Sequence, residues 1–263
     1  MDAMVIAGHT PGKIDPLLEY AGATSKALIP IAGKPMVQWV TDALAGSRHV
    51  ERLVVVGLDA SCGIDFGPKP AVFVPDQGRL VKNLWAGAQR ALQDTADRDH
   101  FLVCACDIPL ITTAIVDDHV AAMLSTPHDV CYTIVDQATM LARFPTSRRS
   151  YTHLRDGVFC GGDLNMAGSR AIEMNPTLWD DLLEARKSAL RQARRVGFWT
   201  LLQFATRSLS IAAAEKRAEK IFGLKCRAVR TPHAEIGMDV DKPFQLDIVR
   251  AELESRQGAH KRG

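Results

Sequence analysis

Short runs of apolar residues alternate with segments of helical periodicity along most of the chain. The runs are rich in β-branched residues and are bounded by turn residues, which is typical of strands buried on both faces of a parallel sheet. We expect strands at Met4–Ala7, Leu53–Leu58, Ala71–Val74, Phe101–Cys106 and Val130–Val135.

The segments between these runs predict helices. Apolar residues repeat at helical spacing over Val81–Leu92, Ile115–Leu124 and Phe244–Leu253, and Pro243 starts the last of these helices. Pro35 is expected at the first position of a further helix that runs towards Leu44. The alternation of strand and helix predicts an α/β fold with a doubly wound, mostly parallel sheet, in which ligands bind beyond the carboxyl ends of the strands.

We expect one domain over residues 1–256, with a helical insertion at about 171–223 and a frayed tail over 257–263. A cluster of basic residues in the insertion is interpreted as a solvated helix face, or as a site that captures an anionic acceptor. The apolar run Val196–Leu202 follows it and is interpreted as core; a homodimer contact and a contact with a lipid-like acceptor stay open. The basic residues are Arg186, Lys187, Arg191, Arg194 and Arg195.

Composition narrows the class of protein. The 263 residues are 47% hydrophobic and 24% charged, and the net charge of +2 gives no argument for binding nucleic acid. From the sequence we expect no signal peptide at its start, and it has no apolar stretch long enough to span a bilayer. Its six cysteines form no C-x-x-C pair, so we expect a reduced, cytoplasmic protein without a zinc site.

Two aspartates far apart in the sequence stand beside prolines at the ends of predicted elements. Asp107 follows the strand at Phe101–Cys106, and Asp241 precedes the helix that starts at Pro243. Either could cap a helix. Together they favour a site for a hard cation, Mg²⁺ or alternatively Mn²⁺, because such cations take carboxylates plus substrate phosphates. Asp239 shares a face with Asp241 in an extended segment and could approach the same cation.

A glycine loop follows the first strand, where backbone N–H groups could contact phosphate. It does not match a P-loop, because three residues separate Gly8 from Gly12 and Ile14 follows Lys13 in place of Ser or Thr. The alternative interpretation is that these glycines only shape a turn between a strand and a helix.

Several motifs in order along the chain resemble the MobA-like NTP transferase family, within the nucleotide-diphospho-sugar transferase fold. The loop has fewer glycines than the family's usual loop, and Lys13 stands where the family usually has arginine. The matching segments are Ala7-Gly8 with Gly12-Lys13, Ser25–Pro30, Gly33–Met36, Gln77–Arg79, Asp107–Leu110, Gly161–Asn165 and Asp239–Pro243.

This resemblance implies a nucleotidyltransferase with Asp107 and Asp241 as ligands of Mg²⁺ and Asp239 as their substitute. Lys13 and Lys26 would stabilise the triphosphate and the charge that develops on it. The expected nucleotide contacts are Ala7, Gly8, Gly12, Gln77, Gly78 and Asn83. The expected acceptor contacts are Gly161, Gly162, Asp163 and Asn165, although the two glycines could equally form a tight turn or bulge.

The predicted reaction transfers an NMP from an NTP to a phosphorylated small molecule, with release of pyrophosphate. A phosphate acceptor is already ionised at neutral pH, which fits a chain that shows no catalytic triad and no histidine to which we assign a role. Two alternatives remain: a nucleotide-binding protein without chemistry, and a metal-dependent glycosyltransferase that uses a nucleotide sugar. A dinucleotide oxidoreductase is disfavoured because no G-x-G-x-x-G follows the first strand.

Overall fold

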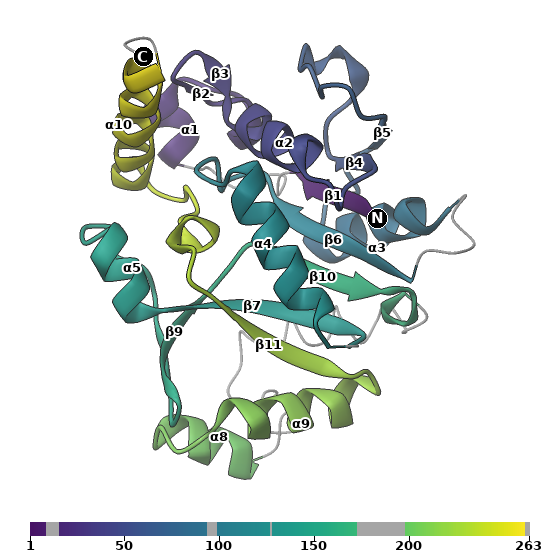
Figure 1. Cartoon of the computed structure of the whole chain (residues 1–263), viewed down its shortest axis with the longest axis vertical. Coiled ribbons are helices and arrows are strands. Elements are labelled where there is room, and N and C mark those ends of the chain that lie inside the picture. Colours follow the sequence, from purple (N-terminus) through teal and green to yellow (C-terminus); the bar gives the residue numbers. More distant parts are fainter. Residues whose placement is uncertain (9–15, 94–98, 127, 173–197, 261–263) are drawn as a thin grey trace.

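The computed structural model describes residues 1–8, 16–93, 99–126, 128–172 and 198–260. Within these ranges a nine-stranded sheet crosses the molecule in the order β5-β4-β1-β6-β10-β7-β9-β8, and β11 pairs with β7 (Figure 1). The strands are β1 (Asp2–Ile6), β4 (Arg52–Val56), β5 (Ala71–Val74), β6 (His100–Ala105), β7 (Val130–Asp136), β8 (Thr152–Leu154), β9 (Gly157–Gly161), β10 (Leu164–Gly168) and β11 (Cys226–Thr231). A separate two-stranded ribbon joins β2 (Pro30–Ile31) to β3 (Lys34–Pro35).

The five strands predicted from apolar runs are confirmed as β1, β4, β5, β6 and β7. The first four pair in parallel, and β11 lies parallel to β7. The antiparallel strands β8, β9 and β10 were not predicted, because their segments are short and rich in glycine and polar residues. The sheet is therefore mixed but mostly parallel, with β10 inserted antiparallel between β6 and β7.

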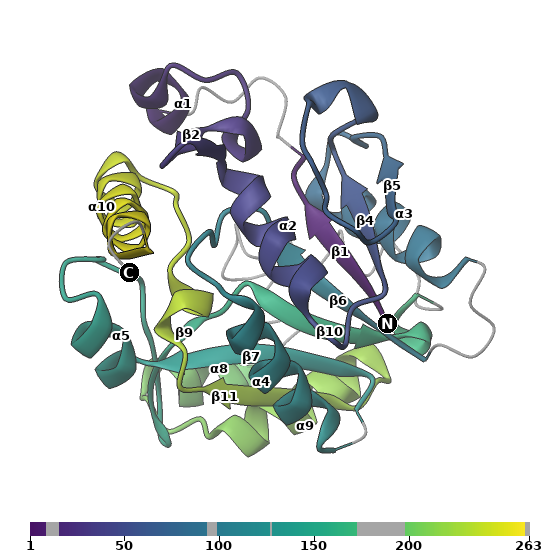
Figure 2. The ribbon, with the colours of Figure 1, turned by 45° about the horizontal axis from the view of Figure 1, so that its top comes forward.

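Helices cover both faces of the sheet (Figure 2). On one face α2 (Met36–Gly46) and α4 (Thr113–Leu124) pack on a core that includes Ala3 and Val5 of β1. On the other face α3 (Leu80–Leu92) packs on a core that includes Met4 of the same strand. Successive residues of β1 thus point to opposite cores, which explains why the strand is apolar from Ala3 to Ile6.

The structure describes five further helices and four short 3-10 turns. They are α1 (Pro16–Ala21), α5 (Gln137–Arg143), α8 (Phe198–Ala205), α9 (Ile211–Phe222) and α10 (Pro243–His260), with short 3-10 turns η1 (Lys26–Leu28), η2 (Ala60–Cys62), η3 (Ser169–Ala171) and η4 (Ala234–Gly237). None of the helices in the described ranges has the length and apolar character that crossing a membrane requires.

Two boundaries differ from expectation. Pro35 ends β3 and immediately precedes α2, so it is not the first residue of that helix. Helix α10 continues to His260 in the expected tail, and Gln257 Nε2 donates to the carbonyl oxygen of Ala32 at 2.7 Å. In the expected insertion, α8 and α9 are helical as predicted, whereas residues 173–197 with all five residues of the basic cluster lie outside the described residues.

Candidate active site

The structure places the predicted residues Gly8, Asp107 and Asp241 at one edge of the sheet, beyond the carboxyl ends of the parallel strands. The N–H of Ala7 donates to Val56 O at 2.8 Å, that of Gly57 to Val74 O at 2.9 Å, and that of Cys106 to Ile6 O at 3.1 Å. These bonds extend the ladder past the last strand residues and align the loops that follow β1, β4, β5 and β6. The sheet geometry therefore brings together loops that are far apart in sequence.

Gly8 lies where the loops after β1, β4 and β5 are packed against one another. A Cβ atom on Gly8 would lie 2.4 Å from Asn83 Nδ2. Gly57, with φ of +95°, is equally confined, because a Cβ there would lie 2.4 Å from the Cα of Gly8. Gly57 is thus required by its conformation and by close backbone approach, and Gly8 by the close approach of the Asn83 side chain.

The loop over Asp76–Gly78 is held by the side chain of Asn83, which is 2% exposed. Asn83 Oδ1 accepts from the N–H of Gln77 at 2.7 Å, and Asn83 Nδ2 donates to Asp76 Oδ1 at 2.9 Å. Asp76 also accepts from the N–H of Gly78 at 2.8 Å. The predicted nucleotide contact Asn83 thus lies next to Gly8, and the N–H groups of the predicted contacts Gln77 and Gly78 are bonded to the side chains of Asn83 and Asp76. Asp76 was missed, although its turn-forming residue type before Gln77-Gly78 was visible in the sequence.

Lys26, Asp107 and Asp241 meet at the same edge. Lys26 Nζ lies 2.6 Å from Asp107 Oδ2 and 2.5 Å from Asp241 Oδ1. The two aspartates are also joined through the backbone, because the N–H of Val240 donates to Asp107 O at 2.9 Å. The side chains of Lys26 and Asp107 are mostly buried, whereas that of Asp241 is half exposed. Three residues from three separate elements therefore form one charged cluster.

The electrostatics of this cluster follow from its geometry. Burial lowers the pKa of Lys26, but the charges of Asp107 and Asp241 outweigh that effect and raise the pKa above its ordinary value. Burial raises the pKa of Asp241, but the charge and hydrogen bond of Lys26 outweigh it, so the pKa is lowered overall. At neutral pH the cluster is an ammonium group shared by two carboxylates.

Asp239 lies against a different cation, Arg149, with which its Oδ1 forms an ion pair. Both side chains are 14% exposed. Arg149 follows α5 in the chain and was missed by the sequence analysis, since it occurs in a polar loop without a motif. The i, i+2 relationship of Asp239 and Asp241 places each carboxylate beside its own basic partner.

Asp163 connects the site to the strands. Its N–H donates to Ile236 O at 3.0 Å and its carbonyl accepts from the N–H of Ala105 at 3.0 Å, so its backbone bridges η4 and β6. Burial, reinforced by the negative charge of Asp107, raises the pKa of Asp163 to about 7, and Arg149 opposes the shift. The predicted acceptor contact Asp163 thus lies beside the Asp107 carboxylate.

The neighbours of Asp163 are engaged in packing. A Cβ on Gly162 would lie 2.8 Å from Thr133 Cγ2 and 2.9 Å from Ile236 Cγ2, and one on Gly161 would lie 2.3 Å from the hydroxyl of Tyr132. Asn165 accepts from the N–H of Thr133 at 2.8 Å and donates to Gly162 O at 3.1 Å. In this structure these predicted acceptor contacts join β7, β9 and β10.

Two predicted residues of the amino-terminal loop, Gly12 and Lys13, lie outside the described residues, whereas Ala7 is buried at the end of β1 and Gly8 adjoins Asn83. In the described ranges no three or more His, Cys, Asp or Glu side chains are grouped to hold a metal by themselves. The donor set nevertheless suits Mg²⁺. Asp107 Oδ1 is buried without a hydrogen-bond partner, and the positively charged ammonium group of Lys26 lies between Asp107 and Asp241. Mg²⁺ needs only one or two carboxylates when substrate phosphates and water complete its shell.

The sequence was compared with known families and structures. The model of the MobA-like NTP transferase domain matches residues 20–206. The chain belongs to the MobA-like NTP transferase family. This assignment identifies the protein as a nucleotidyltransferase and confirms the resemblance noted from the motifs. A search of curated proteins gives no match.

Solved structures agree with the family assignment. A hypothetical transferase from Thermus thermophilus has 34% sequence identity and a TM-score of 0.79, over 93% of this chain and 98% of that one. CMP:2-keto-3-deoxy-manno-octonic acid synthetase complexed with CTP has 14% identity and a TM-score of 0.56, over 97% and 99% of the chains. The 4-diphosphocytidyl-2C-methyl-D-erythritol synthase of Anaerococcus prevotii has 11% identity and a TM-score of 0.58, over 96% and 95%. These last two similarities show that this member of the MobA-like family shares their fold.

Proposed function

We propose that the protein is a Mg²⁺-dependent nucleotidyltransferase that moves an NMP from an NTP to a phosphorylated small-molecule acceptor. A phosphate oxygen of the acceptor attacks the α-phosphorus, the bond between the α-phosphorus and the bridging oxygen breaks, and pyrophosphate leaves with the electron pair. The observation that carries the proposal is the position of Lys26 Nζ between the Asp107 and Asp241 carboxylates.

Asp107 and Asp241 would hold the cation, which, when bound, neutralises charge on the triphosphate and on the leaving pyrophosphate. Lys26 lies at the same point in the structure, so in the loaded site its ammonium group would contact phosphate oxygens in place of one or both carboxylates. Its role is electrostatic, since a raised pKa keeps it protonated throughout the physiological range. A phosphate acceptor is already ionised, so the proposal requires no general base. Catalysis would come from positioning and charge neutralisation.

The loops around Gly8 supply the nucleotide side of the site in this proposal. Asn83 and Asp76 fix the Gln77-Gly78 backbone against Gly8, so a nucleotide would meet a preformed wall of main chain with no side chain on Gly8. Preorganisation of this kind lowers the entropic cost of binding. Asp163 lies beside Asp107, and Arg149 pairs with Asp239. In this proposal Asp163 and Arg149 would face the acceptor.

The test is a panel of the four NTPs with Mg²⁺ or Mn²⁺, each combined with a library of phosphorylated metabolites, with pyrophosphate release as the readout. The proposal expects release with at least one NTP and acceptor pair, and its loss when EDTA is added. Binding of NTP without pyrophosphate release from any pair would favour a nucleotide-binding protein. Turnover of a nucleotide sugar without use of an NTP would favour a glycosyltransferase.

A further inference from the structure

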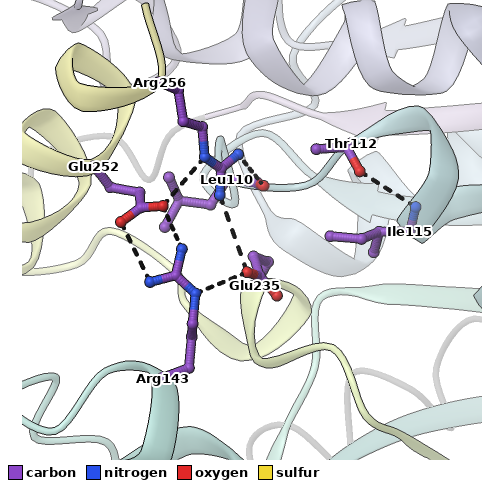
Figure 3. A network of polar contacts seen from close by, with 7 residues as sticks. All are labelled: Leu110, Thr112, Ile115, Arg143, Glu235, Glu252 and Arg256. Atoms are coloured by element: carbon purple, nitrogen blue, oxygen red, sulfur yellow. Dashed lines mark hydrogen bonds and ion pairs between the residues drawn. The ribbon is translucent and has the colours of Figure 1, made fainter. Parts of the chain in front are cut away.

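Four charged side chains outside the cluster of Lys26, Asp107 and Asp241 form an ion-pair network on the side of the molecule that carries α10 (Figure 3). Arg143 comes from α5, Glu235 from η4, and Glu252 and Arg256 from α10. We call these residues the α10 network.

Each arginine in the α10 network contacts both glutamates. Arg143 Nε lies 3.2 Å from Glu235 Oε1, and its two terminal nitrogens reach the two carboxylate oxygens of Glu252, one of them at 3.2 Å. Arg256 Nε lies 3.2 Å from Glu252 Oε1, and its Nη2 lies 4.0 Å from Glu235 Oε1. The network thereby connects α5 to η4 and α10, which follow it by about ninety residues or more in the chain.

Arg256 makes one further contact that connects the network to the catalytic cluster. Its Nη1 donates to the carbonyl oxygen of Leu110 at 3.0 Å. Leu110 is fully buried and comes three residues after Asp107. Figure 3 shows the Arg256 guanidinium between this carbonyl and the two glutamates.

The same network also lies on both sides of Asp241 in the chain. Glu235 comes six residues before Asp241, and α10 begins two residues after it. The backbone of Asp241 is further fixed by Gln245, whose Oε1 accepts from the N–H of Asp241 at 2.9 Å. A shift of α10 relative to Leu110 would therefore change the distance between Asp241 and Asp107.

We propose that Arg256 is a positioning residue that sets the separation of Asp107 and Asp241, and so tunes the affinity of the site for a divalent cation. The inference rests on the proposed function. A guanidinium suits this task because its planar fork of donors reaches a carboxylate and a carbonyl together. Loss of outer-shell contacts of metal sites typically costs ten- to a hundredfold in affinity. Arg256 contacts Leu110 and not the carboxylate of Asp107 or Asp241, so we expect the lower part of that range.

A role in stability alone would have a different signature. Arg256 is 34% exposed and Glu252 is 26% exposed, and ion pairs at such positions contribute little to the free energy of unfolding. A purely structural network would therefore leave cation affinity unchanged in any variant that still folds. The affinity for a cation in the absence of nucleotide separates the two roles.

The experiment measures Mn²⁺ binding by electron paramagnetic resonance, without nucleotide, in the wild type, Arg256→Gln, Arg256→Lys and a control. Arg256→Gln should raise the apparent Kd for Mn²⁺ about tenfold. Arg256→Lys keeps the charge but not the planar fork of donors, so its apparent Kd should lie between those of the wild type and Arg256→Gln. The control is Tyr20→Phe, which removes the hydrogen bonds from Tyr20 to Asp247 and so cuts a different tether of α10. It should bind Mn²⁺ like the wild type.

Wild-type Mn²⁺ affinity in Arg256→Gln would overturn the proposal, and if that variant does not fold, wild-type affinity in Arg256→Lys would do so. Equal weakening in Tyr20→Phe would also overturn it, because the effect would then belong to α10 packing in general. These results leave the proposed function intact. If the wild type binds no Mn²⁺ and releases no pyrophosphate, the proposed function fails and the positioning role fails with it.

Discussion

The backbone N–H of Val240 donates a hydrogen bond to the carbonyl oxygen of Asp107 at 2.9 Å. This bond joins the turn after β6 to the segment before α10, across more than a hundred residues of sequence. On either side of it the carboxylates of Asp107 and Asp241 share the ammonium group of Lys26. A main-chain contact thus holds in place the residues on which the proposed chemistry depends.

Replacement of Lys26 should separate catalysis from cation binding. We expect Lys26→Met to lower turnover about a hundredfold, because a preorganised charge contact is lost. In the absence of nucleotide the same variant should bind Mn²⁺ at least as tightly as the wild type, because the ammonium group that pairs with both carboxylates is gone. Pyrophosphate release and titration calorimetry measure the two effects. Lys216→Ala, on the exposed surface of α9, is the control and should match the wild type in both.

A large drop in Mn²⁺ affinity in Lys26→Met would contradict this account, because Lys26 would then help to build the cation site. Unchanged turnover would remove Lys26 from the proposed mechanism.

Asp239 and Asp241 should differ in their effect on the cation. The structure pairs Asp239 with Arg149 and Asp241 with Lys26. We therefore expect Asp241→Asn to abolish Mn²⁺ binding and turnover, and Asp239→Asn to leave Mn²⁺ affinity within about threefold of the wild type, because only a ligand of the cation controls its affinity directly. The same Mn²⁺ titration on both variants measures the difference. Equal losses would show that Asp239 is also a ligand, as the sequence resemblance allowed.

The convergence of these residues could be predicted only in part. The apolar runs located β1, β4, β5, β6 and β7, and the position of Asp107 after β6 indicated the edge of the sheet at which it lies. Arg149 could not be predicted, because it occurs in a polar loop whose path is set by packing of distant elements. The strands β8 to β11 were missed for a related reason: their three to six residues include polar side chains or glycine, and so short a pattern does not distinguish a strand from a turn.

The glycines of the Gly161-Gly162 pair illustrate the same limit. From sequence, close approach of a substrate and close packing were equally good explanations. The structure places Thr133 and Ile236 where a Cβ of Gly162 would lie. We expect Gly162→Ala to lower the free energy of unfolding by about 1–3 kcal/mol, the usual cost of overpacking a filled site. Denaturant unfolding measures this value. A stable Gly162→Ala protein with a raised KM for the acceptor would support the substrate explanation instead.

His119 should make stability depend on pH. It is 1% exposed, and its Nε2 lies 2.7 Å from Thr133 Oγ1. Because Thr133 donates its own hydroxyl proton to Leu164 O, we assign the donor role to the Nε2–H of a neutral His119. Burial, assisted by nearby His233 and opposed by Asp118, lowers the pKa of His119 from 6.5 to about 4. The unfolded chain therefore binds a proton between pH 6.5 and 4 that the folded protein does not bind.

The contribution of neutral His119 to the free energy of unfolding is therefore fully present above pH 6.5. As pH falls towards 4, up to roughly 3 kcal/mol of this contribution is lost. His119→Gln keeps a donor for Thr133 but does not titrate, so its stability should fall less than that of the wild type over this range. Urea unfolding of both proteins at pH 7, 6 and 5 measures the difference. Parallel pH profiles would show that His119 does not govern this dependence.

The most direct test of the central claim is a crystal structure with Mn²⁺ and a non-hydrolysable NTP, in which the anomalous signal locates the ion. We predict an Mn²⁺ peak in direct coordination with carboxylate oxygens of both Asp107 and Asp241, with Lys26 Nζ moved onto phosphate oxygens. An ion that contacts neither aspartate, or a nucleotide bound with the Lys26 bridge intact, would contradict the account.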